Sequence, residues 1–251
     1  MRSWSPLTSL GLPLLAAAFL LVGTSCSSNE PRERPHGHSH GHDHGHHHDH
    51  GDGDHHGDHA TVHHRFDDAE KWAARFEDPA RDAWQQPERV LEWLELEPNH
   101  RVADIGAATG YFPIRIAPHV PQGVVYGVDV EPNLMEFLAK RAEREGHGNV
   151  RTIVCAPADP KLPEAVDRVI VVNTYHHIGD RRRYFGELRQ KLRANGQLMI
   201  VDFKKGDWPV GPGDDHKIMP EQVEDELSEA GYRCIRREEL PYQYVRVFEA
   251  R

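Results

Sequence analysis

Beyond Asn99 the sequence alternates short apolar runs with helical patterns, and this alternation constrains the fold more than any other feature. The apolar runs are rich in β-branched residues and are predicted to be strands, whereas most stretches between them have the spacing of amphipathic helices. Strands that are buried on both faces and alternate with helices predict an α/β fold, a doubly wound, mostly parallel seven-stranded sheet with helices on both faces. The predicted strands cover residues 101–105, 124–128, 150–155, 168–172, 197–201, 232–237 and 244–249, and the predicted helices cover residues 112–119, 133–145, 180–192 and 220–230. Only a short turn separates the last two strands, which predicts a terminal antiparallel hairpin.

The first 26 residues are predicted to be a targeting segment. Arg2 supplies a positive charge, and the apolar stretch 10–22 is too short, and too interrupted by Pro13, for a membrane span of about 20 residues. The sequence around Cys26 resembles a bacterial lipoprotein signal, which implies a lipid anchor at Cys26 on an exported protein, periplasmic or at the cell surface. Gly23 stands where that pattern prefers Leu, so ordinary cleavage just before Cys26 is the alternative.

Residues 27–65 form a histidine-rich tract that is predicted to be disordered, because it has too few apolar residues to offset its ordering entropy. Fourteen of the 20 histidines lie between His36 and His64, interleaved with aspartates. Imidazole and carboxylate groups are ligands for Zn, Ni or Cu, so divalent metal ions are predicted partners, with no individual ligand assigned. The alternative is a flexible, pH-responsive linker whose affinity for metal is incidental.

Two further segments follow: a helical lead-in over residues 66–98, with one helix expected at 87–94, and a main domain over residues 99–251. The only cysteines of the main domain, Cys155 and Cys234, fall on strands that we expect at opposite edges of the sheet. That separation exceeds the roughly 7 Å between Cα atoms that a disulfide tolerates. Two free thiols are therefore predicted.

The charge balance argues against a nucleic acid partner. Acidic residues outnumber Lys and Arg by 40 to 30, which gives a net charge of −10, whereas binding to phosphates needs a basic surface. The basic run 181–183 is interpreted as a solvated face at the start of a helix.

The motif with the strongest chemical meaning follows the first predicted strand. Gly106 and Gly110 bracket a loop that leads into a helix, where glycine permits a sharp turn and unpaired N–H groups meet a ligand. A second strand ends in Asp129, 19 residues beyond Gly110, at the spacing of an acid that binds ribose hydroxyls. A nicotinamide site would need Gly-x-Gly-x-x-Gly, and the loop is instead Gly-Ala-Ala-Thr-Gly, with Asp104 two residues before it.

The stretch from Val102 to Phe248 resembles the class I S-adenosylmethionine-dependent methyltransferases, whose first motif is an acid, one residue and a glycine loop. The resemblance includes Ala158-Asp159 after the third strand, Asn173-Thr174-Tyr175-His176-His177 after the fourth, and residues 192–198 leading into the fifth. It implies that S-adenosylmethionine is bound by Asp104 and the backbone of Gly106, Ala107 and Gly110 at its amino acid end, by Asp129 at the ribose, by Asp159 at the adenine amine, and near Asn173 at the methyl group. Asp159 has an alternative role, which is to cap the turn before Pro160.

The resemblance implies methyl transfer to a small-molecule acceptor, and a general base is needed only if the acceptor must lose a proton. His176 and His177 are the best-placed candidates in such a fold, and His216 is a further one. Asn173 is followed by Thr-Tyr-His, so the motif associated with nucleobase amines is absent. The competing hypothesis is an exported, metal-binding lipoprotein that retains a methyltransferase fold as a binding module.

Overall fold

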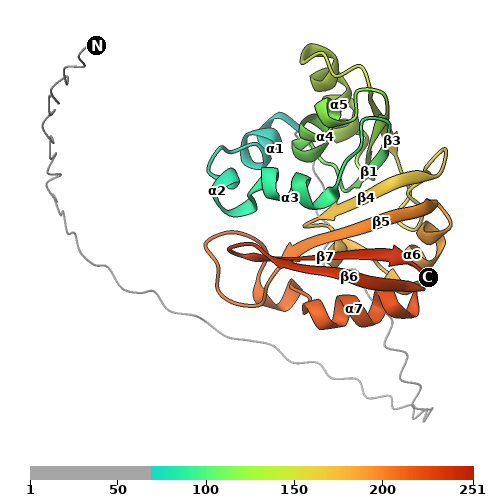
Figure 1. The fold of residues 1–251 in the computed structure, drawn as a ribbon. Coiled ribbons are helices and arrows are strands. Elements are labelled where there is room, and N and C mark those ends of the chain that lie inside the picture. The colour runs from blue at the N-terminus through green and yellow to red at the C-terminus, as the bar shows by residue number, and fades with distance from the viewer. Residues whose placement is uncertain (1–68) are drawn as a thin grey trace, which may run out of the picture. The chain divides into compact units, whose positions relative to one another are not determined.

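The computed structural model describes residues 69–251, which are arranged around one seven-stranded sheet (Figure 1). The predicted targeting segment, the histidine-rich tract and the first residues of the predicted lead-in lie outside the described residues. The strands are β1 (Arg101–Ile105), β2 (Val124–Asp129), β3 (Val150–Val154), β4 (Val166–Val172), β5 (Leu192–Phe203), β6 (Tyr232–Glu239) and β7 (Gln243–Ala250). All seven predicted strands are therefore confirmed.

The strand order is β3-β2-β1-β4-β5-β7-β6. Strands β1 to β5 pair in parallel, and β7 pairs antiparallel with both β5 and β6. This is the predicted doubly wound sheet with a terminal hairpin. Cys234 lies on the edge strand β6, and Cys155 directly follows the opposite edge strand β3, so both predicted free thiols are confirmed.

The helices of the described residues are short. They are α1 (Ala69–Phe76), α2 (Arg81–Gln85), α3 (Pro87–Leu94), α4 (Tyr111–Ile116), α5 (Pro132–Arg144), α6 (Arg181–Arg189) and α7 (Pro220–Glu229), with single 3₁₀ turns η1 (Ala117–His119), η2 (Tyr175–His177) and η3 (Asp214–His216). The prediction that the helix after residue 180 extends to 192 was wrong, because Leu192 pairs with Val166 and already belongs to β5.

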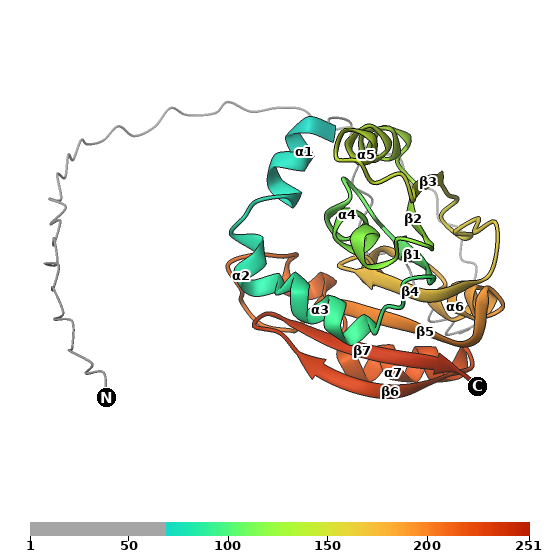
Figure 2. The same cartoon turned by 45° about the horizontal axis from the view of Figure 1, so that its top comes forward.

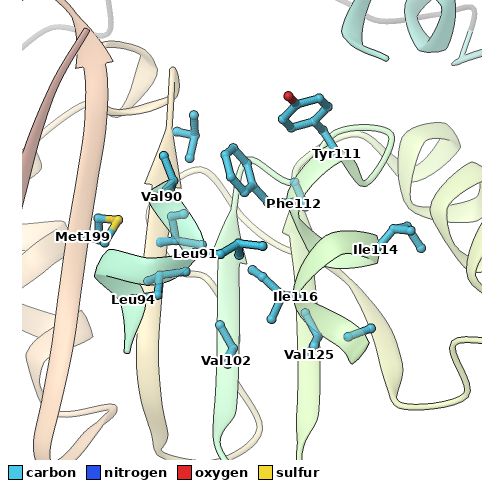
Figure 3. Packing of buried hydrophobic residues seen from close by; sticks show 14 of the residues in the cluster. Val90, Leu91, Leu94, Val102, Tyr111, Phe112, Ile114, Ile116, Val125 and Met199 are labelled. Carbon is cyan, nitrogen blue, oxygen red and sulfur yellow. The ribbon is translucent and has the colours of Figure 1, made fainter. Parts of the chain in front are cut away.

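Each face of the sheet has its own apolar core. Helices α3, α4 and α5 cover one face, where α3 places Val90, Leu91 and Leu94 against sheet residues such as Val102 and Met199 (Figures 2 and 3). Helices α6 and α7 cover the other face with residues that include Phe185, Leu188 and Leu227. Alternate residues of the central strands supply both cores, which explains why most residues of those strands are apolar.

The basic run at the start of α6 differs from its interpretation as a solvated face. Arg181 is buried, and its guanidinium donates to both carboxylate oxygens of Glu226 at 2.7 and 2.9 Å. Arg182 and Arg183 are exposed and pair with Glu229 and Glu187. The run therefore attaches α6 to its neighbours and leaves no uncompensated basic patch.

Candidate functional site

The candidate site lies at the carboxyl ends of β1 and β4, where the strand order reverses direction. From β1 the chain proceeds to β2 and β3 on one side, and from β4 to β5 on the other. Such a reversal opens a crevice outside the strand ends, which is the usual ligand position in doubly wound sheets. A cavity of about 1800 Å³ occupies this place. Pockets for one small molecule are usually about 300–1,000 Å³, so this cavity has room for two ligands side by side.

The glycine loop forms the floor of the cavity between β1 and α4. Gly106 has φ +79°, and a Cβ at this position would lie 2.1 Å from Oγ1 of Thr174. Gly110 has φ +97° and meets Leu138 in the same way. The N–H groups of Gly106 and Ala107 donate to the carbonyl of Val128, which fixes the loop against the end of β2. The predicted loop residues therefore share one wall of the cavity with Asp104.

Asp104 is the most deeply buried carboxyl group of the cavity wall. Asp104 is the last residue but one of β1, and its side chain is almost fully buried. No described residue donates a hydrogen bond to it. Burial raises the pKa of Asp104 to about 8, while the nearby Arg81 guanidinium opposes that shift and Asp129 adds to it. A buried carboxylate without a donor is suited to a cationic ligand group, which would supply both a charge and hydrogen bonds.

Asp129 lies at the end of β2, on the other side of the glycine loop. Its Oδ2 accepts from the N–H of Ala108 at 3.0 Å, and its Oδ1 accepts from the N–H of Glu131 at 3.1 Å. Burial raises the pKa of Asp129, and the backbone donors oppose this shift. Each carboxylate oxygen retains a second lone pair, so the oriented group can still accept from a pair of ligand hydroxyls.

Asp159 does not line the cavity. It is exposed in a turn that follows β3, where its Oδ1 accepts from the N–H of Lys161 at 2.7 Å. The residues of this segment that do reach the cavity are Cys155, Ala156, Pro157 and Ala158. The geometry therefore favours the turn-capping role of Asp159 over contact with an adenine amine.

Asn173 follows β4 with φ +54°, a conformation that asparagine adopts more readily than most residues. Its Oδ1 accepts from Nε2 of Gln243 at 2.5 Å, and Oε1 of Gln243 accepts from Nε2 of Gln85 at 2.8 Å. Both glutamines are fully buried. This chain of amides connects helix α2 of the lead-in to the predicted methyl-presenting position.

The two predicted histidines both line the cavity, but they differ in their surroundings. His176 is buried on η2, and its Nδ1 lies 2.9 and 3.0 Å from the carboxylate oxygens of Asp202 at the end of β5. The ring of His177 lies 4.1 Å from that of His176 and is less buried. His216 lines the cavity from the loop between β5 and α7. Asp202 is a site residue that sequence reasoning missed.

The lead-in segment supplies much of the remaining cavity wall. Trp72 and Phe76 of α1 stack on each other, and Trp84 of α2 lies against Phe203 of β5 with ring centroids 5.6 Å apart. Arg81 packs over the ring of Tyr111 at 3.7 Å. The helical lead-in was predicted from the sequence, but no sequence signal singled out Arg81.

Glu77, just after α1, attaches this wall to the glycine loop. Its Oε1 accepts from Oγ1 of Thr109 at 2.9 Å and pairs with Nη1 of Arg141 on α5 at 2.7 Å. Arg141 in turn donates to the carbonyl of Thr109. One carboxylate thus connects α1, the glycine loop and α5.

Comparison with known proteins agrees with this geometry. Residues 103–198 match the family model described as a methyltransferase domain. The glycine loop lies within the matched residues, and the sheet order is that of the methyltransferase fold. The chain is similar to the uncharacterized methyltransferase YcgJ of Bacillus subtilis, with 28% identity over 122 residues, or 48% of this chain and 47% of that protein. It is also similar to the methyltransferase GfsG of Streptomyces halstedii, with 27% identity over 128 residues, or 50% of this chain and 46% of that protein.

The chain spans about half the length of these curated relatives. Among solved structures, a SAM-dependent methyltransferase from Aquifex aeolicus is similar with a TM-score of 0.67 and 25% identity, and the match covers 72% of this chain and 97% of that one. A TehB-like SAM-dependent methyltransferase from Corynebacterium glutamicum, 14% identical with a TM-score of 0.57, shows the fold alone.

Residues 69–251 contain neither a metal site nor a membrane-spanning helix. Within this range no group of three or more His, Cys, Asp or Glu side chains is arranged to hold a metal ion. No helix of the same range combines the length and the apolar character that crossing a bilayer requires. The predicted metal tract and the predicted anchor at Cys26 both lie outside these residues.

Proposed function

We propose that this protein transfers a methyl group from S-adenosylmethionine to a small-molecule acceptor bound in the same cavity. The observation that carries the proposal is the pair of buried carboxyl groups, Asp104 and Asp129, on either side of a glycine loop at the reversal point of the sheet. Asp104 fits the ammonium group of the cofactor, and Asp129 fits its two ribose hydroxyls. The backbone of Gly106, Ala107 and Gly110 passes between them.

Bound S-adenosylmethionine supplies a methyl group that is already activated by its sulfonium. The protein therefore needs chiefly to align the acceptor with that methyl group and to exclude water. Trp72, Phe76 and Trp84 form an apolar part of the cavity wall, and Asn173 lines the same cavity. The buried amide contacts of Asn173 hold it in place before any ligand arrives.

The test is calorimetric titration of S-adenosylmethionine and S-adenosylhomocysteine into the full chain, with a chelator present so that the histidine-rich tract carries no metal. Micromolar binding of both compounds with one site per chain is expected. If folded protein binds neither compound, the methyltransferase proposal fails.

The competing hypothesis, an exported lipoprotein that sequesters metal, depends on residues 1–68 and not on the cavity. Export, the anchor at Cys26 and the binding of Zn, Ni or Cu stay predictions from the sequence. Uptake of Zn²⁺ or Ni²⁺ that weakens as pH falls through about 6.5, where imidazole protonates, and that is lost when residues 36–64 are deleted, would support the metal prediction. Unchanged uptake after that deletion would reject it.

A further inference from the structure

The acceptor half of the cavity contains a histidine whose ring is oriented by a buried carboxyl group. His176 is 2% exposed and Asp202 is 1% exposed, so both side chains are removed from bulk water. The Asp202 carboxylate accepts from three donors: Nδ1 of His176 at 2.9 and 3.0 Å, the N–H of His176 at 3.4 Å and the N–H of Phe203 at 2.8 Å. The carboxylate is therefore fixed by backbone donors and aimed at the imidazole ring.

This pairing selects one tautomer of His176. A carboxylate can only accept, so Nδ1 carries the proton and Nε2 has a lone pair. When Nε2 takes up a second proton, the resulting imidazolium is paired with the buried Asp202 charge. The arrangement is that of a general base with an orienting acid, and His176 also lines the cavity.

The titratable and charged groups that surround the pair come from several elements. On β7, Tyr244 lies opposite Asp202 in register, and burial first, then the Asp202 charge, raise the pKa of its hydroxyl well above the usual value. On α7, the carboxylate of Glu226 is already engaged by Arg181 and by the hydroxyl of Tyr175. His177 lies beside His176 on the same 3₁₀ turn, and Asp104 with Arg81 borders the cavity from the side of β1.

The wall around the acceptor position is aromatic. Phe203 directly follows Asp202 in the chain, and its ring lies between the Trp84 ring and the loop at Gly211, where a Cβ would approach the ring to 2.7 Å. Trp84 and Phe203 both line the cavity. Such walls favour a flat aromatic molecule, which stacks or packs edge-on against them.

We infer that the acceptor is a flat aromatic molecule with an ionisable hydroxyl, that His176 removes the hydroxyl proton, and that Asp202 positions His176; this inference rests on the proposed function. A phenol has a pKa near 10, as tyrosine does, so its oxygen is a weak nucleophile at neutral pH until a base removes the proton. A neutral amine attacks through its lone pair without that step and would leave the pair unused.

The proposed methyl transfer needs only the acceptor, His176, Asp202 and the methyl donor. The O–H bond of the acceptor breaks and its proton goes to Nε2 of His176. The oxygen forms a bond to the methyl carbon, and the carbon–sulfur bond breaks with its electron pair returning to sulfur. The products are a methyl ether, a thioether and an imidazolium paired with Asp202, which loses its proton to solvent when the products leave.

The test uses the full chain saturated with S-adenosylhomocysteine and 4-nitrophenol as the acceptor probe, because only the phenolate form of this probe is coloured. Titrating pH at saturating protein reports the apparent pKa of the bound probe. Transfer of its proton to His176 is expected to lower that pKa by about 1 unit or more. The probe 4-nitroanisole, which has the same ring and no proton, should bind with an affinity that does not follow this pH profile.

The variants His176→Gln and Asp202→Asn should abolish the lowering, and Asp202→Glu should restore part of it. The control variant His119→Gln changes an exposed histidine on η1, outside the cavity, and should behave as the wild type. The affinity for S-adenosylhomocysteine, measured on every variant, shows that the cofactor half is folded. If one variant does not fold, Asp202→Glu and the wild-type titration still decide the question.

Each result has one meaning. If the protein binds S-adenosylhomocysteine, three outcomes would overturn the inference and leave the proposed function intact. They are an unshifted pKa of the bound probe, a pKa shift that survives His176→Gln, and no binding of 4-nitrophenol. Failure to bind S-adenosylhomocysteine would overturn both.

Discussion

Gly106 and Thr174 lie in contact across the crevice between the ends of β1 and β4, so that a Cβ on Gly106 would overlap Oγ1, Cγ2 and Cβ of the threonine at 2.1 to 2.7 Å. The segments at Gly106 and Thr174, 68 positions apart in the chain, can therefore meet at the floor of the cavity because Gly106 has no Cβ. The loop that would carry the cofactor cannot move toward β4 without displacing the turn that bears His176.

This contact predicts a strong effect of Gly106→Ala. The substitution should destabilise the fold and weaken binding of S-adenosylhomocysteine at least tenfold, because the side chain clashes and the backbone has φ +79°. Gly146→Ala is the matched control, since Gly146 has φ +78° with nothing within 4 Å of its Cβ position. Thermal unfolding and calorimetry of both variants measure the difference. Equal losses would mean that backbone strain alone, and not Thr174, explains the requirement for glycine.

Asp129→Ala should weaken the binding of S-adenosylhomocysteine by about 1.5–3 kcal/mol, because a charged hydrogen-bond acceptor for the ribose is lost. The substitution also removes the acceptor for two backbone N–H groups. Asp159→Ala is the comparison, and little change in affinity is expected because Asp159 is exposed and does not line the cavity. A loss at Asp159 as large as that at Asp129 would restore the adenine role that the family resemblance implies for Asp159.

The raised pKa of Asp104 should make the free energy of unfolding depend on pH. Its folded-state pKa of about 8 lies above the value of an unfolded aspartate, so between pH 4 and pH 8 the folded chain binds more protons than the unfolded chain. The contribution of Asp104 to the free energy of unfolding therefore falls as pH rises through that window, by up to about 1.4 kcal/mol per pH unit. Asp104→Asn should remove this component, as denaturant unfolding from pH 5 to pH 8.5 would show.

Bound S-adenosylhomocysteine should have the opposite pH dependence. An ammonium group bound beside Asp104 favours its ionised form, so stabilisation by saturating S-adenosylhomocysteine should be greater at pH 8 than at pH 6 in the wild type. If the difference in free energy of unfolding between the wild type and Asp104→Asn stays constant with pH, the raised pKa of Asp104 is contradicted.

Glu77→Gln should release α1 from the domain. The change removes the charge that pairs with Arg141, a partly buried contact for which a loss of roughly 1 kcal/mol is expected. Because α1 has no buried residue of its own, faster amide hydrogen exchange is expected in residues 69–77, together with weaker ligand binding. Glu92→Gln on α3 changes an exposed glutamate and should alter neither measurement. Unchanged exchange in α1 would show that aromatic packing alone holds it.

Local sequence was sufficient to predict much of the fold and the carboxyl groups on either side of the glycine loop. The glycine spacing, the acid before the loop and the acid after β2 are determined by residues within one βαβ unit, so their pattern is visible along the chain. Asp202 was missed because it meets His176 only through the pairing of β4 with β5, 26 residues later. Gln85 meets Gln243 across 158 residues, a distance at which no periodicity carries information. Asp159 matched a family position in sequence, yet the turn around Pro160 directs it to solvent.

Part of the aromatic wall of the cavity, namely Trp72, Phe76 and Trp84, comes from residues that precede the whole of the matched domain, residues 103–198. The segment that carries these rings also packs Val90, Leu91 and Leu94 into the core and is hydrogen-bonded to the rest of the domain at Glu77, Asp82 and Gln85. Single rings of this segment can therefore be substituted to change the shape of the cavity, whereas replacement of the whole segment would also remove side chains that stabilise the sheet.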